Sequence, residues 1–310
     1  MNVDQLVSFL DDRSAASMWL SDIGVRDTSA GHQHLVSMAS HGMTLDLLTT
    51  LSEQLSLHLP VVGDPDLALA TLCRFVAASR NPLSLGTLIE QDDDALPTLL
   101  QLFSASPMLG DMLVADPAAY DLVRLTEGQP VSREHLVGEI CGEVAGLSSS
   151  RDVMAALRQF KERETLRIAY GDIIRKQSSD TVASQLSFLA DAVCEAAVTF
   201  TRRVWVGKRG KPRNRDGQPT RFVMIGLRRL GGNEQDYSTT VRGFFIYEED
   251  GRTDGDRPID NREFFNKVCA DTLQLLGEET ELGVAYKVNV EKTPAQRVGR
   301  WCLTQQETIN

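Results

Sequence analysis

The residues best suited to chemistry lie in one stretch, Arg221 to Tyr247 (RFVMIGLRRLGGNEQDYSTTVRGFFIY). Two apolar runs typical of strands flank a double glycine, Gly231-Gly232. Glycines after a strand let backbone amides approach a triphosphate, and we expect a short helix whose N-terminus adds to the binding. Arg229 and Ser238 are the side chains expected beside a bound phosphate. A tight turn that binds no ligand is the alternative for the same residues.

The stretch resembles the signature of the glutamine synthetase adenylyltransferase (glutamate-ammonia-ligase adenylyltransferase) family, F-A-V-I-x-M-G-K-L-G-G-x-E-L-N-Y-x-S-D-I-D-L-I-F-x-Y. Two upstream blocks, Ser104 to Val123 and Leu157 to Ile174, resemble helices of the same family, so the resemblance extends over most of residues 70 to 310. The matching signature residues are Phe222, Ile225, Leu230, Gly231, Gly232, Glu234, Tyr237, Ser238, Phe245 and Tyr247.

The resemblance breaks at the positions that bind metal in the family. Its two aspartates in D-I-D fall on Thr240 and Arg242, and a third aspartate falls on Asn289. Nucleotidyl transfer depends on Mg²⁺, which takes oxygen ligands and usually one or two carboxylates. A hydroxyl and an amide are weak substitutes, and the guanidinium of Arg242 repels a cation. We therefore expect no catalytic residue and no bound metal here, with Thr240, Arg242 and Asn289 as degenerate positions.

Two alternatives remain for this site. The alignment could be shifted, so that nearby acids supply the metal ligands; these acids are Asp236, Glu248, Glu249 and Asp250. Arg242 could also form a salt bridge with Glu234 or Asp236, which would replace the metal.

The resemblance implies a regulatory role in nitrogen metabolism. The family attaches AMP to, and removes it from, a tyrosine of glutamine synthetase in response to a PII signalling protein, and it uses two nucleotidyltransferase halves. This chain resembles one half. We expect a non-catalytic pseudoenzyme that acts by binding glutamine synthetase, a PII protein or an intact paralogue. The alternatives are an active adenylyltransferase or deadenylylase with substitute ligands, which would need ATP and Mg²⁺, and a metal-independent nucleotide sensor.

Composition indicates a cytoplasmic globular protein. The 310 residues can form two domains with a sizeable core. No run of about 18 apolar residues suggests a membrane span, and the acidic N-terminus does not resemble a signal peptide. The five scattered cysteines indicate free thiols in a reducing compartment rather than a zinc site. Residues 1–150 contain 6 Arg, no Lys and 20 acids, which argues against nucleic acid as a partner.

The pattern of apolar residues predicts an α+β fold. A helical bundle is expected over residues 1–182. The family resemblance implies that residues 183–310 form a nucleotidyltransferase-like mixed β-sheet with packed helices. We expect strands over 222–227, 241–248 and 286–290 and a helix over 261–276. The basic segment 207–217 is predicted to be a loop or hairpin that is either solvated or binds a phosphate or an acidic partner. The charged residues Glu162, Arg163, Glu164 and Arg167 are expected on a solvated helix face.

Overall fold

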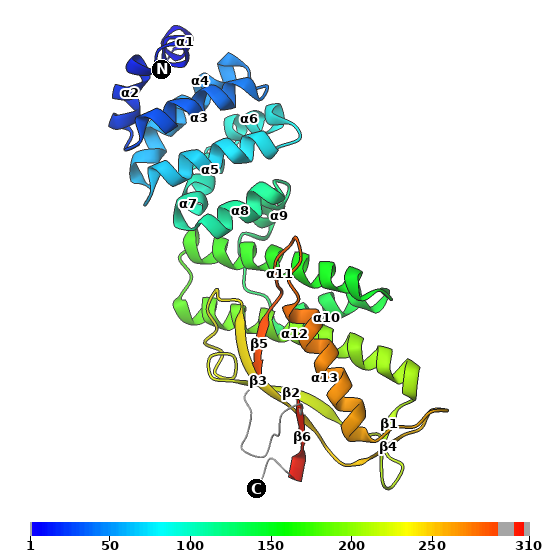
Figure 1. Cartoon of the computed structure of the whole chain (residues 1–310). Coiled ribbons are helices and arrows are strands. Elements are labelled where there is room, and N and C mark those ends of the chain that lie inside the picture. Colours follow the sequence, from blue (N-terminus) through cyan, green and yellow to red (C-terminus); the bar gives the residue numbers. More distant parts are fainter. Residues whose placement is uncertain (1, 291–300, 307–310) are drawn as a thin grey trace. The chain divides into compact units, whose positions relative to one another are not determined.

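Helices form most of the computed structural model, which describes residues 2–290 and 301–306 (Figure 1). The chain divides into two compact units. One contains Met1–Gly128 with Ala169–Gln177, and the other contains Gln129–Ile168 with Ser178–Asn310. The position 182/183, suggested by the sequence as a boundary, lies inside one long helix of the second unit, and that unit begins earlier, at Gln129.

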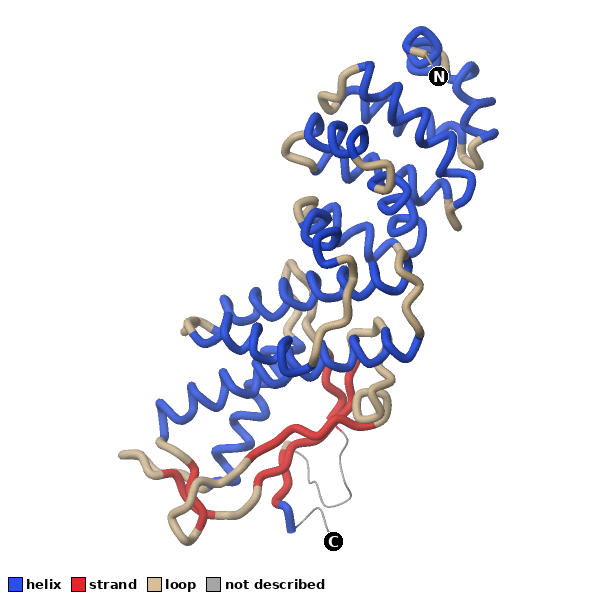
Figure 2. The backbone as a smooth tube through the Cα atoms, turned by 180° about the vertical axis from the view of Figure 1, so that it is seen from behind, coloured by secondary structure: helices blue, strands red, loops and turns tan. Residues whose placement is uncertain are grey.

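The first unit is helical throughout its described residues (Figure 2). Polar caps begin several of the helices; for example, the Ser106 hydroxyl accepts a hydrogen bond from the amide of Met108, and Pro107 follows at the first helical position. Its elements are α1 (Val3–Asp11), α2 (Arg13–Asp22), α3 (Thr28–Ser40), α4 (Leu45–His58), η1 (Leu59–Val61), α5 (Pro65–Ala78), α6 (Pro82–Gln91), α7 (Ala95–Ala105), α8 (Pro107–Ala115) and α9 (Ala119–Thr126).

The second unit contains all the described strands (Figure 2). The boundary between the units falls near the end of α11. The elements of the second unit are α10 (Arg133–Ala145), most of α11 (Ser150–Ile173), α12 (Ser179–Arg209), β1 (Pro212–Asn214), β2 (Phe222–Leu227), β3 (Thr240–Tyr247), β4 (Gly251–Thr253), α13 (Asn261–Gly277), β5 (Lys287–Val290) and β6 (Cys302–Thr304).

The main sheet is mixed, as predicted. β2 pairs antiparallel with β3, while β5 and β6 both pair parallel with β3. A separate two-stranded sheet joins β1 to β4. The α+β fold class is thus confirmed, with helices packed on the mixed sheet.

The alternation of side chains along β3 gives the main sheet one buried and one open face. Val241, Phe245 and Tyr247 are almost fully buried against the helices, because α12 and α13 cover that face. Thr240 and Arg242 are exposed on the opposite face. The sheet therefore presents its polar positions away from the helical core.

α12 is the central helix of this unit. Among the described helices it alone is long and apolar enough to cross a membrane, but 67% of its most apolar window is buried inside the structure. Packing in the core accounts for this apolar character. α12 also continues to Arg209, so the segment predicted as a loop begins as helix and becomes a β-hairpin arm only at β1.

The predicted solvated face of α11 is wrong for two of its residues. Glu164 and Arg167 are buried, and the Arg167 Nε donates to Glu164 Oε2 at 2.7 Å. Arg167 also donates to the carbonyl of Gln129 at 2.5 Å and to Gln185 Oε1 at 3.0 Å. The ion pair of Arg167 with Glu164 agrees with the predicted spacing of three residues. The additional hydrogen bonds to Gln129 and Gln185 satisfy the Arg167 guanidinium and permit its burial.

Candidate functional site

The double glycine lies in a turn that connects β2 to β3, and no helix follows it. The predicted short helix is therefore wrong. Hydrogen bonds inside the turn explain its closed form: the Gly232 amide donates to the Arg228 carbonyl at 2.8 Å, and the Glu234 amide donates to the Arg229 carbonyl at 2.7 Å. The Gly232 amide is consequently already used, so the phosphate cradle expected there is not preformed.

The two glycines have unequal structural roles. A Cβ on Gly231 would lie 2.6 Å from the carbonyl oxygen of Gly226, whereas one on Gly232 would lie 3.3 Å from its nearest atom, the Arg228 carbonyl oxygen. The left-handed backbone conformations of the turn belong instead to Arg228 and Asn233, at φ 54° and 57°. Gly231 is thus required for close backbone contact, and Gly232 is less constrained.

The three degenerate positions lie together on the open face of the sheet. Thr240 and Arg242 are two residues apart on β3, so both point to this face. Asn289 on β5 is the register partner of Arg242. The fold therefore brings a hydroxyl, a guanidinium and an amide to one place.

A cavity of about 290 Å³ adjoins this group, and it contains most of the residues predicted for the site. No carboxylate lines it. Gly231, Gly232 and Asn289 do not line it either. The lining residues are Leu227, Arg228, Arg229, Leu230, Gln235, Ser238, Thr240 and Arg242.

Gln235 is a lining residue that the sequence does not single out. It is buried, and its side-chain amide donates to the Thr240 carbonyl at 3.3 Å and to Ser238 Oγ at 3.4 Å. Its backbone amide donates to the Ser187 hydroxyl on α12 at 3.1 Å. Gln235 thereby holds the end of the turn against both β3 and α12. No sequence signal marks it, because its role depends on partners distant in the chain.

Asp236 is an acid in contact with two residues that line the cavity, Arg229 and Ser238. Asp236 forms an ion pair with Arg229, and its Oδ1 accepts from the Ser238 amide at 3.1 Å. Hydrogen bonding from Ser238 is the main reason that the pKa of Asp236 lies below its usual value, with a smaller contribution from Arg229. Asp236 is therefore charged at neutral pH and neutralises one of the cations beside the cavity.

The other acids named for a shifted alignment lie at the far end of β3. Glu248 pairs with Arg221 at 2.5 Å, Glu249 accepts from Asn214 at 3.1 Å, and Asp250 accepts from the Tyr247 hydroxyl at 2.7 Å. Each has a structural partner there, and none lines the cavity. Within residues 2–290 and 301–306 no cluster of three or more acidic, histidine or cysteine side chains could hold a metal ion. The donor set beside the cavity does not fit Mg²⁺.

The basic segment after α12 is held partly by its own neighbours. Arg213 pairs with Asp254 at 2.8 Å, and the Lys208 ammonium lies 4.8 Å from the centre of the Trp205 ring. These contacts favour a structured hairpin over a nucleic-acid platform.

Comparisons with known proteins find sequences similar to this chain. The family model described as glutamate-ammonia ligase adenylyltransferase matches residues 96–306. The bifunctional glutamine synthetase adenylyltransferase/adenylyl-removing enzyme of Thioalkalivibrio sulfidiphilus is 30% identical over 169 residues, which cover 54% of this chain and 17% of that protein.

Two enzymes of the same name from Pseudomonas match over a longer range. Those of P. putida and P. aeruginosa are 26% and 27% identical over 304 and 305 residues, which cover 93% of this chain and 31% of each relative. The chain thus spans about a third, or less, of the length of these relatives. The match covers the open face of the sheet and most of the helices, and the chain belongs to the glutamate-ammonia ligase adenylyltransferase family.

Proposed function

We propose that this chain is a non-catalytic member of its family that regulates by binding. The observation that carries the proposal is the register pairing of Arg242 with Asn289, two positions at which the family signature has aspartates. Thr240 completes the group on the same face. A nucleotidyltransferase sheet with this set of side chains keeps its shape but lacks the anionic ligands that its chemistry requires.

The physical reason is electrostatic. A divalent ion in the family site is neutralised by carboxylates, and a fixed guanidinium at one of those places repels it instead. The hydroxyl of Thr240 and the amide of Asn289 bring no negative charge. Asp236 already pairs with Arg229.

The proposed partners follow from the relatives, whose name refers to glutamine synthetase. We include a PII signalling protein and an intact paralogue as candidate partners, and we place the protein in the cytoplasm. Binding to glutamine synthetase without modifying it would compete with the active enzyme or recruit it.

A transfer assay tests the proposal directly. The chain is incubated with glutamine synthetase and ATP labelled at the α-phosphate, with Mg²⁺ and with Mn²⁺ in separate reactions. The enzyme of P. aeruginosa serves as the positive control. We expect saturable binding to glutamine synthetase, measured by surface plasmon resonance, and no incorporation of label. Incorporation that disappears in Gly232→Ala, a variant that the turn tolerates better than Gly231→Ala, would instead identify an active enzyme with substitute ligands.

A second candidate function, a metal-independent nucleotide sensor, is favoured by the charge of the small cavity. Arg228, Arg229 and Arg242 line it, and no carboxylate is among its lining residues. Its volume of about 290 Å³ suits a phosphate chain with part of a nucleoside. Calorimetry with ATP in EDTA tests this function. We expect Arg242→Gln to weaken ATP binding about tenfold and the exposed control Arg215→Gln to leave it unchanged.

A further inference from the structure

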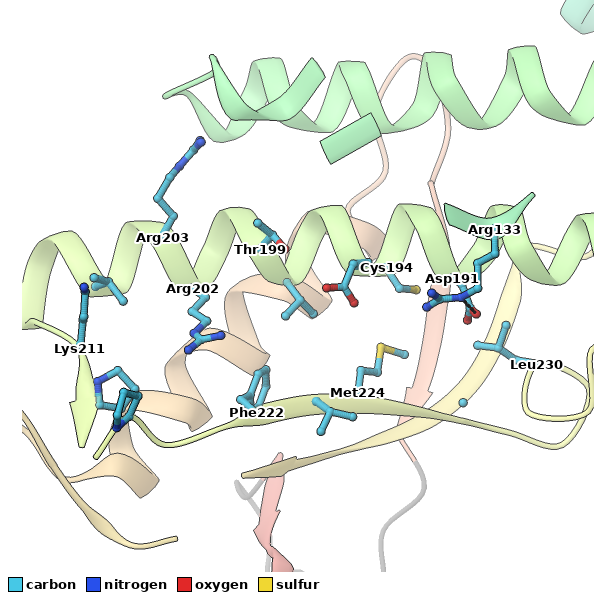
Figure 3. A pocket seen from close by; sticks show the side chains of 17 residues that line it. Arg133, Asp191, Cys194, Thr199, Arg202, Arg203, Lys211, Phe222, Met224 and Leu230 are labelled. Carbon is cyan, nitrogen blue, oxygen red and sulfur yellow. Dashed lines mark hydrogen bonds and ion pairs between the residues drawn. The ribbon is translucent and has the colours of Figure 1, made fainter. Parts of the chain in front are cut away.

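A second, larger cavity lies on the other side of β2, between this strand and α12 (Figure 3). Its volume is about 590 Å³, which is within the range of about 300–1,000 Å³ typical of small-molecule sites. Phe222 and Met224 form its floor, whereas Leu227, which pairs with Arg242, lines the smaller cavity. The two cavities share Leu230, but the large cavity opens on the face of β2 opposite to the small cavity that Thr240 and Arg242 line.

The walls of this cavity are apolar along its middle. Val198 and Val206 on α12 lie across from Phe222 and Met224 on β2. The Phe222 ring stacks on Phe265, with centroids 4.8 Å apart, and this packing fixes the floor of the cavity. Removing apolar surface from water lowers the free energy, so the middle of the cavity favours the apolar body of a ligand.

The charges at the ends of the cavity differ in their availability. Arg133 and Asp191 neutralise each other through an ion pair at 2.7 Å. Arg203 points away from the cavity and donates to the carbonyls of Ala145 and Leu147, at 2.5 Å each, beyond the end of α10 (Figure 3). These three side chains have structural partners and do not need a ligand.

Arg202 and Lys211 are the available cations. Arg202 points from α12 toward Phe222, and Lys211 rises from the segment before β1 at the same end of the cavity (Figure 3). Within residues 2–290 and 301–306, Arg202 makes no hydrogen bond or ion pair. Glu195 also lines the cavity, but it lies two turns earlier on α12, about 10 Å away along the helix axis. The end that contains Arg202 is therefore positively charged.

We propose that the cavity between α12 and β2 binds a small organic anion. The apolar body of the ligand lies on Phe222 and Met224, and its carboxylate, sulfonate or phosphate group lies between Arg202 and Lys211. The guanidinium provides two parallel donors for such a group, and the ammonium adds a second charge. A ligand with a hydrogen-bond donor at its other end would also meet Glu195.

The probe for the test is 8-anilinonaphthalene-1-sulfonate, which combines an aromatic body with a sulfonate and becomes fluorescent in apolar sites. We expect one saturable site on the full chain. Arg202→Gln should weaken binding about tenfold, because it removes charge-assisted hydrogen bonds worth at least about 1.4 kcal/mol. The matched control Arg215→Gln removes the same charge at an exposed turn outside the cavity and should not change binding.

A second variant tests the floor of the cavity. Met224→Trp should fill the apolar middle and abolish binding, with circular dichroism used to verify that the fold is kept. Equal probe affinity in wild type and Arg202→Gln would overturn the proposal, because it would place the probe elsewhere, for example at the smaller cavity lined by Thr240 and Arg242. Several weak sites that respond to neither variant would overturn it as well.

Discussion

Replacing Arg242 by aspartate should create a metal site on the open face of the sheet. In the structure Arg242 and Asn289 are register partners on β3 and β5, and Thr240 lies two residues before Arg242 on the same face. An aspartate at 242 would therefore have one amide oxygen and one hydroxyl beside it. These groups can complete part of the oxygen shell that Mn²⁺ or Mg²⁺ prefers.

The magnitude follows from the exposure of Arg242. Because the Arg242 side chain is exposed, the dielectric constant of water, about 80, gives a lower limit for the electrostatic energy between this position and a bound ion. A divalent ion at ~4 Å from one unit charge then interacts by about 2 kcal/mol, so exchanging a positive for a negative charge changes binding by about 4 kcal/mol. If the flexible arginine turns away in the wild type, only the attraction of about 2 kcal/mol remains. Arg242→Asp should therefore bind Mn²⁺ about 30-fold to 1,000-fold more tightly than wild type.

Electron paramagnetic resonance of free Mn²⁺ measures this change, because the signal of the hexaaqua ion decreases on binding. Arg215→Asp is the matched control, since it changes the net charge equally at an exposed turn far from the sheet face in sequence. Adding Thr240→Asp to Arg242→Asp should tighten binding further, by about 2 kcal/mol. Equal Mn²⁺ affinity in Arg242→Asp and Arg215→Asp, or a tight Mn²⁺ site in the wild type, would refute the reasoning.

Three further predictions concern stability. Gly231→Ala should lower the free energy of unfolding and Gly232→Ala should change it much less, because only the first places a Cβ 2.6 Å from a backbone oxygen. Urea unfolding of both variants measures this difference, and equal losses of stability would contradict it. Arg158 is 1% exposed and donates to the carbonyls of Gly283 at 2.7 Å, of Met154 at 2.9 Å and of Glu278. Arg158→Ala should therefore lower the free energy of unfolding by about 3–5 kcal/mol in the same assay. A loss below about 1 kcal/mol would be incompatible with this role. Burial lowers the pKa of Lys161 from 10.5 to about 8, so the unfolded chain binds more protons between these values and stability should rise with pH from about 8 to 10.5. Lys161→Met should reduce that rise, and an identical pH dependence in the variant would show that other groups cause it.

Local pattern was sufficient to predict the strands β2, β3 and β5 and most helices, but not the short strands β1, β4 and β6. The apolar run over 222–227 has the bounds of β2, and the helix predicted over 261–276 agrees with α13 within one residue. Ser106-Pro107 marks the start of α8, because a hydroxyl cap and a proline at the first helical position act within one turn. Such signals involve neighbours in the chain, so they can be read without a fold.

The errors occur where distant residues decide the outcome. The turn after β2 closes through Gly231 against Gly226 instead of continuing as a helix, and backbone contact of this kind has no residue pattern. The sequence pattern predicts Glu164 and Arg167 to be surface charges. In the structure, hydrogen bonds to Gln185 and to the carbonyl of Gln129 satisfy Arg167, so both charges are buried.

Order and spacing of residues alone carried the resemblance to the family signature, which implies that Arg242, Thr240 and Asn289 stand where the signature has aspartates. Apolar alternation and helical periodicity indicated strands and helices, because both are local, and the mixed sheet was expected only from the resemblance. Tertiary structure decided that Arg242 and Asn289 are neighbours on adjacent strands, that Gln235 fastens the turn, and that a second cavity opens under α12. These features depend on strand register and on packing between segments far apart in the chain, and neither is encoded in any single stretch of residues.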